Sequence, residues 1–289
     1  MSAQQNLVPN GSFEDTVHCP QGAEIYNAKY FSSPTDATPD YFNICALPSN
    51  NSSVPLNLGG FQMPRTGNAY GGFIAYGFGT NYKEYIQSPL LNTLEKDKYY
   101  TIEYYVCLGN FASVACNNLG LCFSQSNSYQ NNTNTLNYPN ALFSTKIISD
   151  TLNWSKITFN YKANGTENYL IIGNFKNDIN TDTILSFAGG NDVYYCIDDI
   201  SITQIDLILP NVFTPNGDGH NDIFYFNSEI IKPNSLTIYN RWGNRIFDSK
   251  NNFAWDGRTT SGVSCNAGIY YYIIQTEAET YKGFLDLIK

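Results

Sequence analysis

Short apolar runs separated by turn-forming residues recur along the whole chain. Some runs alternate strictly, as in residues 99–107, where Tyr100, Ile102, Tyr104 and Val106 would share one face. Strands have this period of two, because successive side chains point to opposite faces of a sheet. The pattern, with Gly, Asn, Asp and Pro between the runs, predicts an all-β fold. Further strands are predicted at 85–87, 119–123, 154–161, 169–173, 194–202, 212–213, 223–226, 236–239, 245–247, 269–274 and 284–288.

A cluster of turn formers after Val212-Phe213 divides the chain into two predicted domains. Pro215, Gly217 and Gly219 end the apolar run, and strand periodicity starts again after them. We place the domain boundary between residues 205 and 206. Residues 1–205 have room for the eight or nine strands of a jelly-roll β-sandwich, and residues 206–289 for a smaller, Ig-like C-terminal β-sandwich of six or seven strands.

Composition favours an extracellular β protein. Aromatic residues make up 15% of the chain and charged residues only 14%, whereas long helices need Glu, Lys, Ala and Leu. Residues 1–205 hold 16 acidic and 9 basic residues, and residues 206–289 hold 9 and 7, so both parts are acidic. Nucleic acid is therefore excluded as a partner, because phosphate binding needs clustered Lys and Arg. No apolar run reaches the ~20 residues of a membrane-spanning helix.

Cysteine usage also indicates an oxidising compartment. Six of the seven cysteines precede residue 206, no Cys-x-x-Cys pair exists and only two histidines occur, so a zinc site is disfavoured. Cys19 and Cys45 form the predicted disulfide, which would staple the N-terminal loop region. The alternative for the other cysteines is a small buried apolar side chain, and Cys265 fits that description best. Met1 leads directly into domain sequence, so we expect an exported chain whose signal peptide has been removed.

Five motifs in the last eighty residues resemble one family. They are Pro-Asn-Val-Phe-Thr-Pro-Asn-Gly-Asp-Gly-x-Asn-Asp at 210–222, Leu236–Phe247, Trp255-Asp-Gly257, Ala267–Tyr272 and Tyr281–Lys289. This order resembles the gliding-motility-associated C-terminal domain, the type B sorting signal of the type IX secretion system. The resemblance implies delivery across the outer membrane to the cell surface by the translocon and its shuttle or partner proteins. It also implies a link to gliding or surface adhesion.

By the same resemblance, the translocon would recognise two turns and the last strand. The implied recognition residues are Asn211, Pro215, Asn216, Gly217, Asp218, Gly219, Asn240, Arg241, Trp242, Gly243, Gly283, Phe284, Leu285 and Leu287.

The first domain has a resemblance of its own. Asn6–Asp15 and Tyr194–Ile202 are similar to the entry and closing strands of galactose-binding-like jelly rolls, a fold shared by many carbohydrate-binding modules. Thr38–Cys45, Arg65–Gly72 and Tyr82–Gln87 are similar to a module that precedes secretion or anchoring domains in bacterial surface proteins. No ligand common to that module is defined. The likeness implies an adhesin-like or glycan-binding cargo domain.

Two sets of oxygen ligands are candidate calcium sites. In jelly rolls of this class the entry-strand Glu, here Glu14, and a closing-strand Asp, here Asp198, often share one calcium ion. Asp198 has the strand parity of Ile200 and Ile202 and should point inward. The alternative is a hydrogen-bonded core carboxylate.

The second candidate set, Asn216, Asp218 and Asp222, places alternate oxygens around a glycine. It lacks the bidentate Glu of an EF-hand, and the alternative there is a series of Asx turns.

Aromatic residues near predicted loops could stack on sugars while polar neighbours bind the hydroxyl groups. The alternative is that these rings cover a sheet face. The candidate glycan-binding residues are Tyr41, Phe42, Arg65, Tyr76, Tyr82 and Glu84.

Catalysis is not predicted. His18 and His220 lie in no recognisable nucleophile context. Two other functions are kept as alternatives. One is a secreted glycoside-active enzyme with paired carboxylates in the jelly-roll cleft, and the other is a structural protein that assembles at the surface through its sheet edges.

Overall fold

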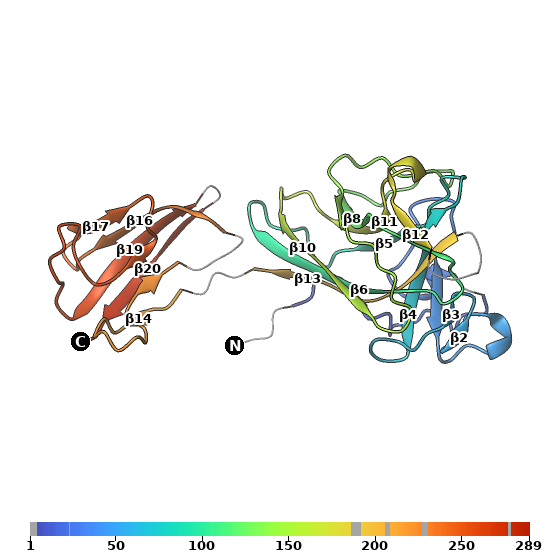
Figure 1. Cartoon of the computed structure of the whole chain (residues 1–289), viewed down its shortest axis with the longest axis horizontal. Coiled ribbons are helices and arrows are strands. Elements are labelled where there is room, and N and C mark those ends of the chain that lie inside the picture. The colour runs from blue at the N-terminus through green and yellow to red at the C-terminus, as the bar shows by residue number, and fades with distance from the viewer. Residues whose placement is uncertain (1–4, 23, 186–191, 206–208, 227–230, 277–278) are drawn as a thin grey trace. The chain divides into compact units, whose positions relative to one another are not determined.

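The computed structural model describes residues 5–22, 24–185, 192–205, 209–226, 231–276 and 279–289. The chain divides into two compact units (Figure 1). The first comprises residues 1–96 and 100–204, and the second comprises residues 97–99 and 205–289. Apart from three 3-10 turns, every regular element described is a strand, as predicted. No described helix is long and apolar enough to cross a membrane.

The first unit is a sandwich of two sheets, and the chain passes repeatedly from one sheet to the other. This alternation is the jelly-roll arrangement. One sheet has the order β1 (Asp40–Asn43), β4 (Ala69–Gly77), β13 (Asp192–Gln204), β6 (Tyr99–Leu108) and β10 (Ser155–Lys162), and the other has the order β5 (Ile86–Pro89), β11 (Tyr169–Asn174), β8 (Leu119–Ser124) and β9 (Leu142–Phe143). Shorter elements are β2 (Leu56–Asn57), β3 (Gly60–Phe61), β7 (Val114–Cys116), β12 (Thr183–Leu185) and the 3-10 turns Ile25–Asn27, Pro48–Asn50 and Asp178–Asn180.

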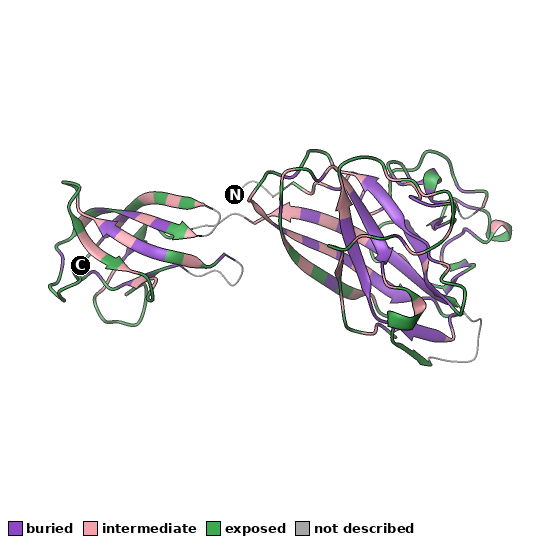
Figure 2. Ribbon diagram, turned by 90° about the horizontal axis from the view of Figure 1, so that it is seen from above, coloured by how far each residue is buried: buried purple, intermediate pink, exposed green. Residues whose placement is uncertain are grey.

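The main core lies between these two sheets. The alternation predicted for residues 99–107 is confirmed in β6, where Tyr100, Ile102, Tyr104 and Val106 are all buried. Figure 2 shows that buried residues are concentrated on the strands of this unit. Burying a large apolar side chain contributes about 1.5–3 kcal/mol, so such a stripe favours folding strongly. The sheets therefore meet through the faces that the sequence pattern indicates.

The N-terminal segment is not a strand, which corrects the prediction of an entry strand at 6–15. Asn10 and Phe13 have φ values of 57° and 61°, which no strand residue adopts. The segment still follows β13, because Leu7 N donates to Ile202 O (2.9 Å) and Ile200 N donates to Gly11 O (2.8 Å). A Cβ on Gly11 would lie 2.0 Å from Ile200 O, so only glycine allows this approach.

The second unit has seven strands in two unequal layers. The order of the main sheet is β14 (Val212–Phe213), β20 (Thr280–Leu287), β19 (Gly268–Thr276), β16 (Pro233–Tyr239) and β17 (Arg245–Ser249), and the second layer is the pair β15 (Phe224–Tyr225) and β18 (Ala254–Trp255). One face of the main sheet packs on a core around fully buried Trp255, with Phe213 and Tyr270 against its ring. The second layer packs on this face of the main sheet only, and it does not cover the other face.

Candidate functional site

Glu14 and Asp198 accept hydrogen bonds from the same turn of the first unit. The turn, residues 65–69, links the segment after β3 to β4. Asp198 Oδ2 accepts from Arg65 N (2.9 Å) and Thr66 N (3.2 Å), and Glu14 Oε1 accepts from Asn68 N (2.8 Å) and Ala69 N (3.1 Å). The structure thus brings the two predicted carboxylates to one place, and Asp198 is buried there.

The surroundings of Asp198 explain its altered acidity. Burial raises the pKa of its carboxyl to about 8, and the charge of Asp199 acts in the same direction. The N–H groups of Thr66, Asp199 and Arg65 oppose this effect in part. Asp199 itself has a φ of 49° at the register shift of β13 and pairs with Arg65.

These contacts match a carboxylate solvated by N–H donors better than a calcium ligand. Calcium takes six to eight oxygen ligands, and the described residues include no group of three or more His, Cys, Asp and Glu able to hold a metal ion. Calcium at Glu14 and Asp198 therefore stays a prediction. The hydrogen-bonded alternative accounts for the contacts seen.

The second candidate metal loop is a closed network of Asx turns. Asp222 accepts from Gly217 N (2.6 Å) and Gly219 N (2.8 Å), and these bonds lower the pKa of its carboxyl. Asn216 Oδ1 accepts from Asp218 N (3.0 Å), and Asp218 Oδ1 accepts from His220 N (2.8 Å). The side chains that were candidate ligands accept from backbone donors, so this geometry fits the turn alternative, and a cation at this loop stays a prediction.

The predicted glycan-binding residues do not form an open cluster. Tyr41, Phe42 and Tyr76 are buried, so their ring faces are not available to a sugar, which corrects that part of the prediction. Arg65 is exposed and lies 3.5 Å above the centroid of the Tyr105 ring. The hydroxyl group of half-buried Tyr82 donates to Glu84 (2.9 Å). Alternation alone could not show this burial, because the rings that pack on Phe42 belong to Tyr70 and Tyr194, on strands that are distant in sequence.

Glu84 belongs to a buried acidic pair that sequence reasoning missed. Asp40, at the start of β1, accepts from the Tyr194 hydroxyl (2.7 Å), and Glu84 accepts from Ile74 N (2.8 Å). Burial raises the pKa of Asp40 to about 8 and of Glu84 to about 7, and the charge of Glu84 further raises that of Asp40. No motif marks Asp40, because its partner Tyr194 is distant in sequence.

Lys83 was also missed. Its side chain is fully buried, and its ammonium group binds Asp178 (2.6 Å) and lies 4.6 Å from the Tyr76 ring centroid. Burial lowers the pKa of Lys83, and Asp178 opposes the shift. A charged residue in a connecting segment gives no sequence signal of burial.

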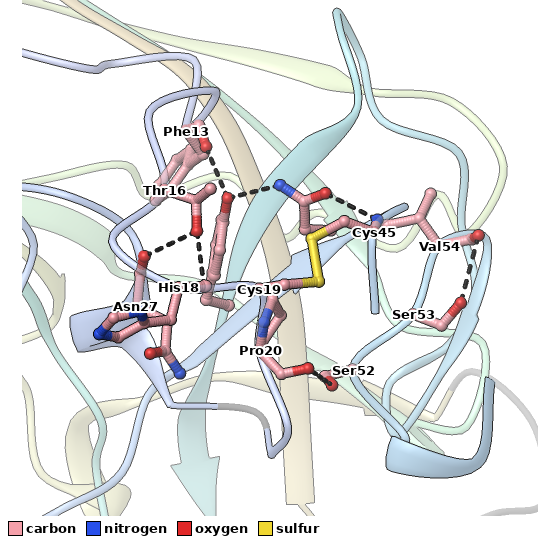
Figure 3. The surroundings of a disulfide bond; sticks show 12 residues. Phe13, Thr16, His18, Cys19, Pro20, Asn27, Cys45, Ser52, Ser53 and Val54 are labelled. Carbon is pink, nitrogen blue, oxygen red and sulfur yellow. Dashed lines mark hydrogen bonds between the residues drawn. A yellow bond between two sulfur atoms is a disulfide. The ribbon is translucent and has the colours of Figure 1, made fainter. Parts of the chain in front are cut away.

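The disulfide between Cys19 and Cys45 is confirmed, with the Cα atoms 5.8 Å apart (Figure 3). It ties the N-terminal loop to the residues after β1. Beside it, Cys45 N donates to Asn43 Oδ1 (2.9 Å), and the Tyr41 hydroxyl donates to Phe13 O (3.0 Å). Cys265 is buried and free, as the alternative held.

A pocket opens at the side of the sandwich, where β8 and β9 face the turn between β10 and β11. Phe123 and Tyr161 lie together in its wall, with ring centroids 4.7 Å apart. Glu167 also lines the pocket, although it is mostly buried, and it accepts from the Tyr161 hydroxyl (2.6 Å). The side-chain amides of Gln125 and Asn140 line the pocket and make no hydrogen bond within the described part of the chain. Such a lining suits a small neutral ligand.

In the second unit, the implied recognition residues fall into two groups. Trp242 and Phe284 are exposed, and the 240–243 turn is held by Asn240 Oδ1, which accepts from Trp242 N (3.1 Å) and Asn244 N (3.0 Å). Leu285 and Leu287 are buried in the core. These two leucines therefore stabilise the unit and cannot touch a partner directly, which corrects the prediction for them.

The glycines of the turns carry the conformations that the motif requires. Gly217, Gly219 and Gly243 have φ values of 82°, 85° and 78°, a region open to glycine and strained for other residues. Asn211 is exposed, and its carbonyl accepts from Asp286 N (2.8 Å), which fixes β14 against β20. The turns thus lie at the surface beside strands of the main sheet.

Comparison with known proteins gives one family match and several weak structural likenesses. A comparison with curated proteins found no match. The CBM22-1 xylan-binding domain of Paenibacillus barcinonensis Xyn10C aligns at 11% identity over 72% of this chain and 99% of its own, with a TM-score of 0.39. TmCBM61 in complex with β-1,4-galactotriose aligns at 12% identity over 70% and 99%, with a TM-score of 0.35.

A Stig cyclase, Fisc, from Fischerella sp. TAU aligns equally well, at 10% identity over 68% of this chain and 96% of its own, with a TM-score of 0.42. All three TM-scores lie below 0.5, so these likenesses say nothing about ligand or activity.

The family match concerns the second unit. Residues 207–287 match the CHU_C type IX secretion signal domain, which covers all seven strands of that unit. The family predicted from the five motifs is thereby confirmed. The C-terminal part of this chain is a type IX secretion signal domain, and it directs the protein out of the cell or to the cell surface.

Proposed function

We propose that this protein is a cell-surface adhesion protein. Its signal domain is recognised by the type IX translocon or its partner proteins, and its jelly roll binds a surface glycan. The observation that carries the proposal is the match of residues 207–287 to a secretion signal domain, because such a domain serves to export what precedes it.

The side pocket of the first unit supports the glycan part. The neighbouring, tilted rings of Phe123 and Tyr161 offer an apolar surface to a sugar, and the unbonded amide groups of Gln125 and Asn140 could bind its hydroxyls. The acidic balance of residues 1–205 favours a neutral glycan over an anionic one. A role in gliding is part of the same proposal and rests on the signal domain alone.

The glycoside-active alternative has one specific observation in its favour. Asp40 and Glu84 are interacting carboxyl groups with raised pKa values, and a glycosidase uses one carboxyl group of raised pKa as its acid beside a second, ionised carboxylate. Both are buried, however, and their oxygens bind Tyr194 and Ile74 N within the fold. We therefore favour binding without hydrolysis.

A delivery assay tests the proposal. Residues 1–289, provided with an export leader and an epitope tag, are expressed in a host with an active type IX system and in a translocon-deficient strain. We expect tag on the surface of intact cells of the first strain and periplasmic retention in the second. Periplasmic retention in both strains, even with candidate partner proteins supplied, would contradict the proposal.

A further inference from the structure

The main sheet of the signal domain has an apolar outer face. Register places Phe284 beside Tyr271 and Tyr271 beside Tyr239, so three aromatic residues form one row across β20, β19 and β16. Residues on either side of this row extend it along the strands. The aromatic face comprises Val212, Tyr239, Ile269, Tyr271, Ile273 and Phe284, and the half-buried Asp286 lies between Val212 and Ile269 at one end of it.

These side chains point away from the core. Their neighbours along the strands, such as Leu285, Tyr272 and Ile238, fill the core on the other side, because side chains alternate between the faces of a strand. Ile269, Tyr271 and Phe284 are 49%, 48% and 51% exposed. The row of Tyr239, Tyr271 and Phe284 is not interrupted by a polar residue, and an exposed aromatic row of this kind often marks an interaction site.

The face has a hollow and a charged border. Tyr239, Tyr271, Ile273, Phe284 and Lys282 line the hollow on β16, β19 and β20. On the next turn, Arg241 lies over the ring of Trp242, with its Cζ 4.4 Å from the ring centroid, and Trp242 is 70% exposed.

Neither Lys282 nor Arg241 has an ion-pair partner within the described part of the chain. Unpaired cations beside an apolar hollow suit a protein surface that offers an apolar ridge edged by carboxylates.

We propose that the aromatic face, with Lys282 and Arg241 at its border, is the surface by which this signal domain docks onto an acid-edged apolar surface of the secretion machinery. This inference rests on the proposed function and gives it a location. The exposed Phe284 and Trp242 then contact the partner, while Leu285 and Leu287 only hold the sheet in shape.

Surface delivery of full-length variants tests the inference. Tyr271→Thr and Phe284→Thr, combined in one chain, remove two rings but keep β-branched residues suited to a strand. We expect the surface amount to fall about tenfold, equivalent to about 1.4 kcal/mol of lost binding. Tyr225→Thr is the matched control, because Tyr225 is an exposed aromatic residue on β15 in the other layer, and delivery should stay at the wild-type level.

A charge reversal provides a test that does not depend on the rings. Lys282→Glu should lower delivery several-fold, whereas Lys250→Glu, at an exposed position after β17, should not. The melting temperatures of the purified variants show that each is folded. Because both lysines are exposed, the charge comparison holds even if the double ring variant unfolds.

The outcomes separate the two claims. If the wild-type chain itself is not delivered, the proposed function fails. If it is delivered and the folded face variants are delivered equally well, only the docking face is refuted. Sedimentation of the purified protein tests whether the aromatic face instead binds a second copy of the chain. A wild-type dimer that the ring variants dissociate would show this and would contradict docking onto the secretion machinery.

Discussion

The direction in which the pKa of a carboxyl group in this protein is shifted depends on whether the group is buried. Asp198 has a raised pKa because it lies inside the first unit, although three backbone N–H groups bind it. Asp222 makes similar N–H contacts at the surface, and its pKa is lowered. The same type of hydrogen bond thus accompanies opposite shifts, because desolvation outweighs the N–H groups only at the buried site.

The raised pKa of Asp198 makes stability depend on pH. Its folded-state pKa, about 8, exceeds the ordinary value of 3.8, so the folded state holds the proton more tightly. This contribution is fully present below pH 4 and is lost as the pH rises through 8. Asp198→Asn should therefore flatten the fall in melting temperature between pH 5 and 8.5. A wild-type slope that Asp198→Asn leaves unchanged would show that Asp40 and Glu84 cause it.

Calcium binding at Glu14 and Asp198 is checked by the same variant. A bound ion would raise the melting temperature in millimolar calcium, because a ligand of the folded state alone stabilises it. The rise would be larger at pH 8 than at pH 5, since protons compete for Asp198, and Asp198→Asn would abolish it. Equal melting temperatures in calcium and in chelator at pH 8 would rule the site out.

Two side-chain links, a disulfide and an asparagine side chain, hold segments that lie between strands. The Cys19–Cys45 disulfide closes a loop with a sequence separation of 26 and ties it to β1, and Asn240 closes the hairpin between β16 and β17. In both cases side chains replace the ladder bonds that a strand would provide. Both were visible in the sequence, the first as a cysteine pair and the second as a turn motif.

Removing the disulfide should destabilise the first unit by about 3 kcal/mol, because a cross-link over a loop of this length restricts the unfolded chain. The variant is Cys19→Ser with Cys45→Ser, and the measurement is denaturant unfolding followed by tryptophan fluorescence. Reducing agent should shift the wild type to the same midpoint and leave the variant unchanged. An unshifted variant would show that the loop is held by other contacts.

Asn240→Ala should lower the free energy of unfolding of the second unit by about 1–2 kcal/mol, since two backbone donors lose their acceptor. Asn251→Ala is the control, because only the backbone of this exposed residue is hydrogen-bonded, to Ser249. Urea titration compares the two variants. Equal midpoints would mean that the turn keeps its shape without the side chain.

The whole molecule joins a signal domain, shown by its family match, to a jelly roll whose binding function is proposed. We expect the full chain to bind neutral polysaccharide without cutting it, since the acidic pair of Asp40 and Glu84 is buried. Retention on immobilised polysaccharides and assay of new reducing ends measure the two properties. Release of reducing ends that Asp40→Asn abolishes, with the fold intact, would favour the enzyme alternative.

Local sequence patterns were enough to predict the all-β class, most of the longer strands, the secretion signal and the disulfide, but the predicted entry strand at 6–15 was wrong and the strands β1 and β4 were missed. The confirmed predictions follow from local patterns, because a strand's period, a turn's glycine and a motif's order are written in neighbouring residues. The accessibility of individual side chains, in contrast, depends on contacts between segments that are distant in sequence. Tyr41, Glu84, Lys83 and Leu285 are buried, because distant segments cover them. The aromatic face is open for the converse reason, since the β15–β18 layer covers only one side of the sheet.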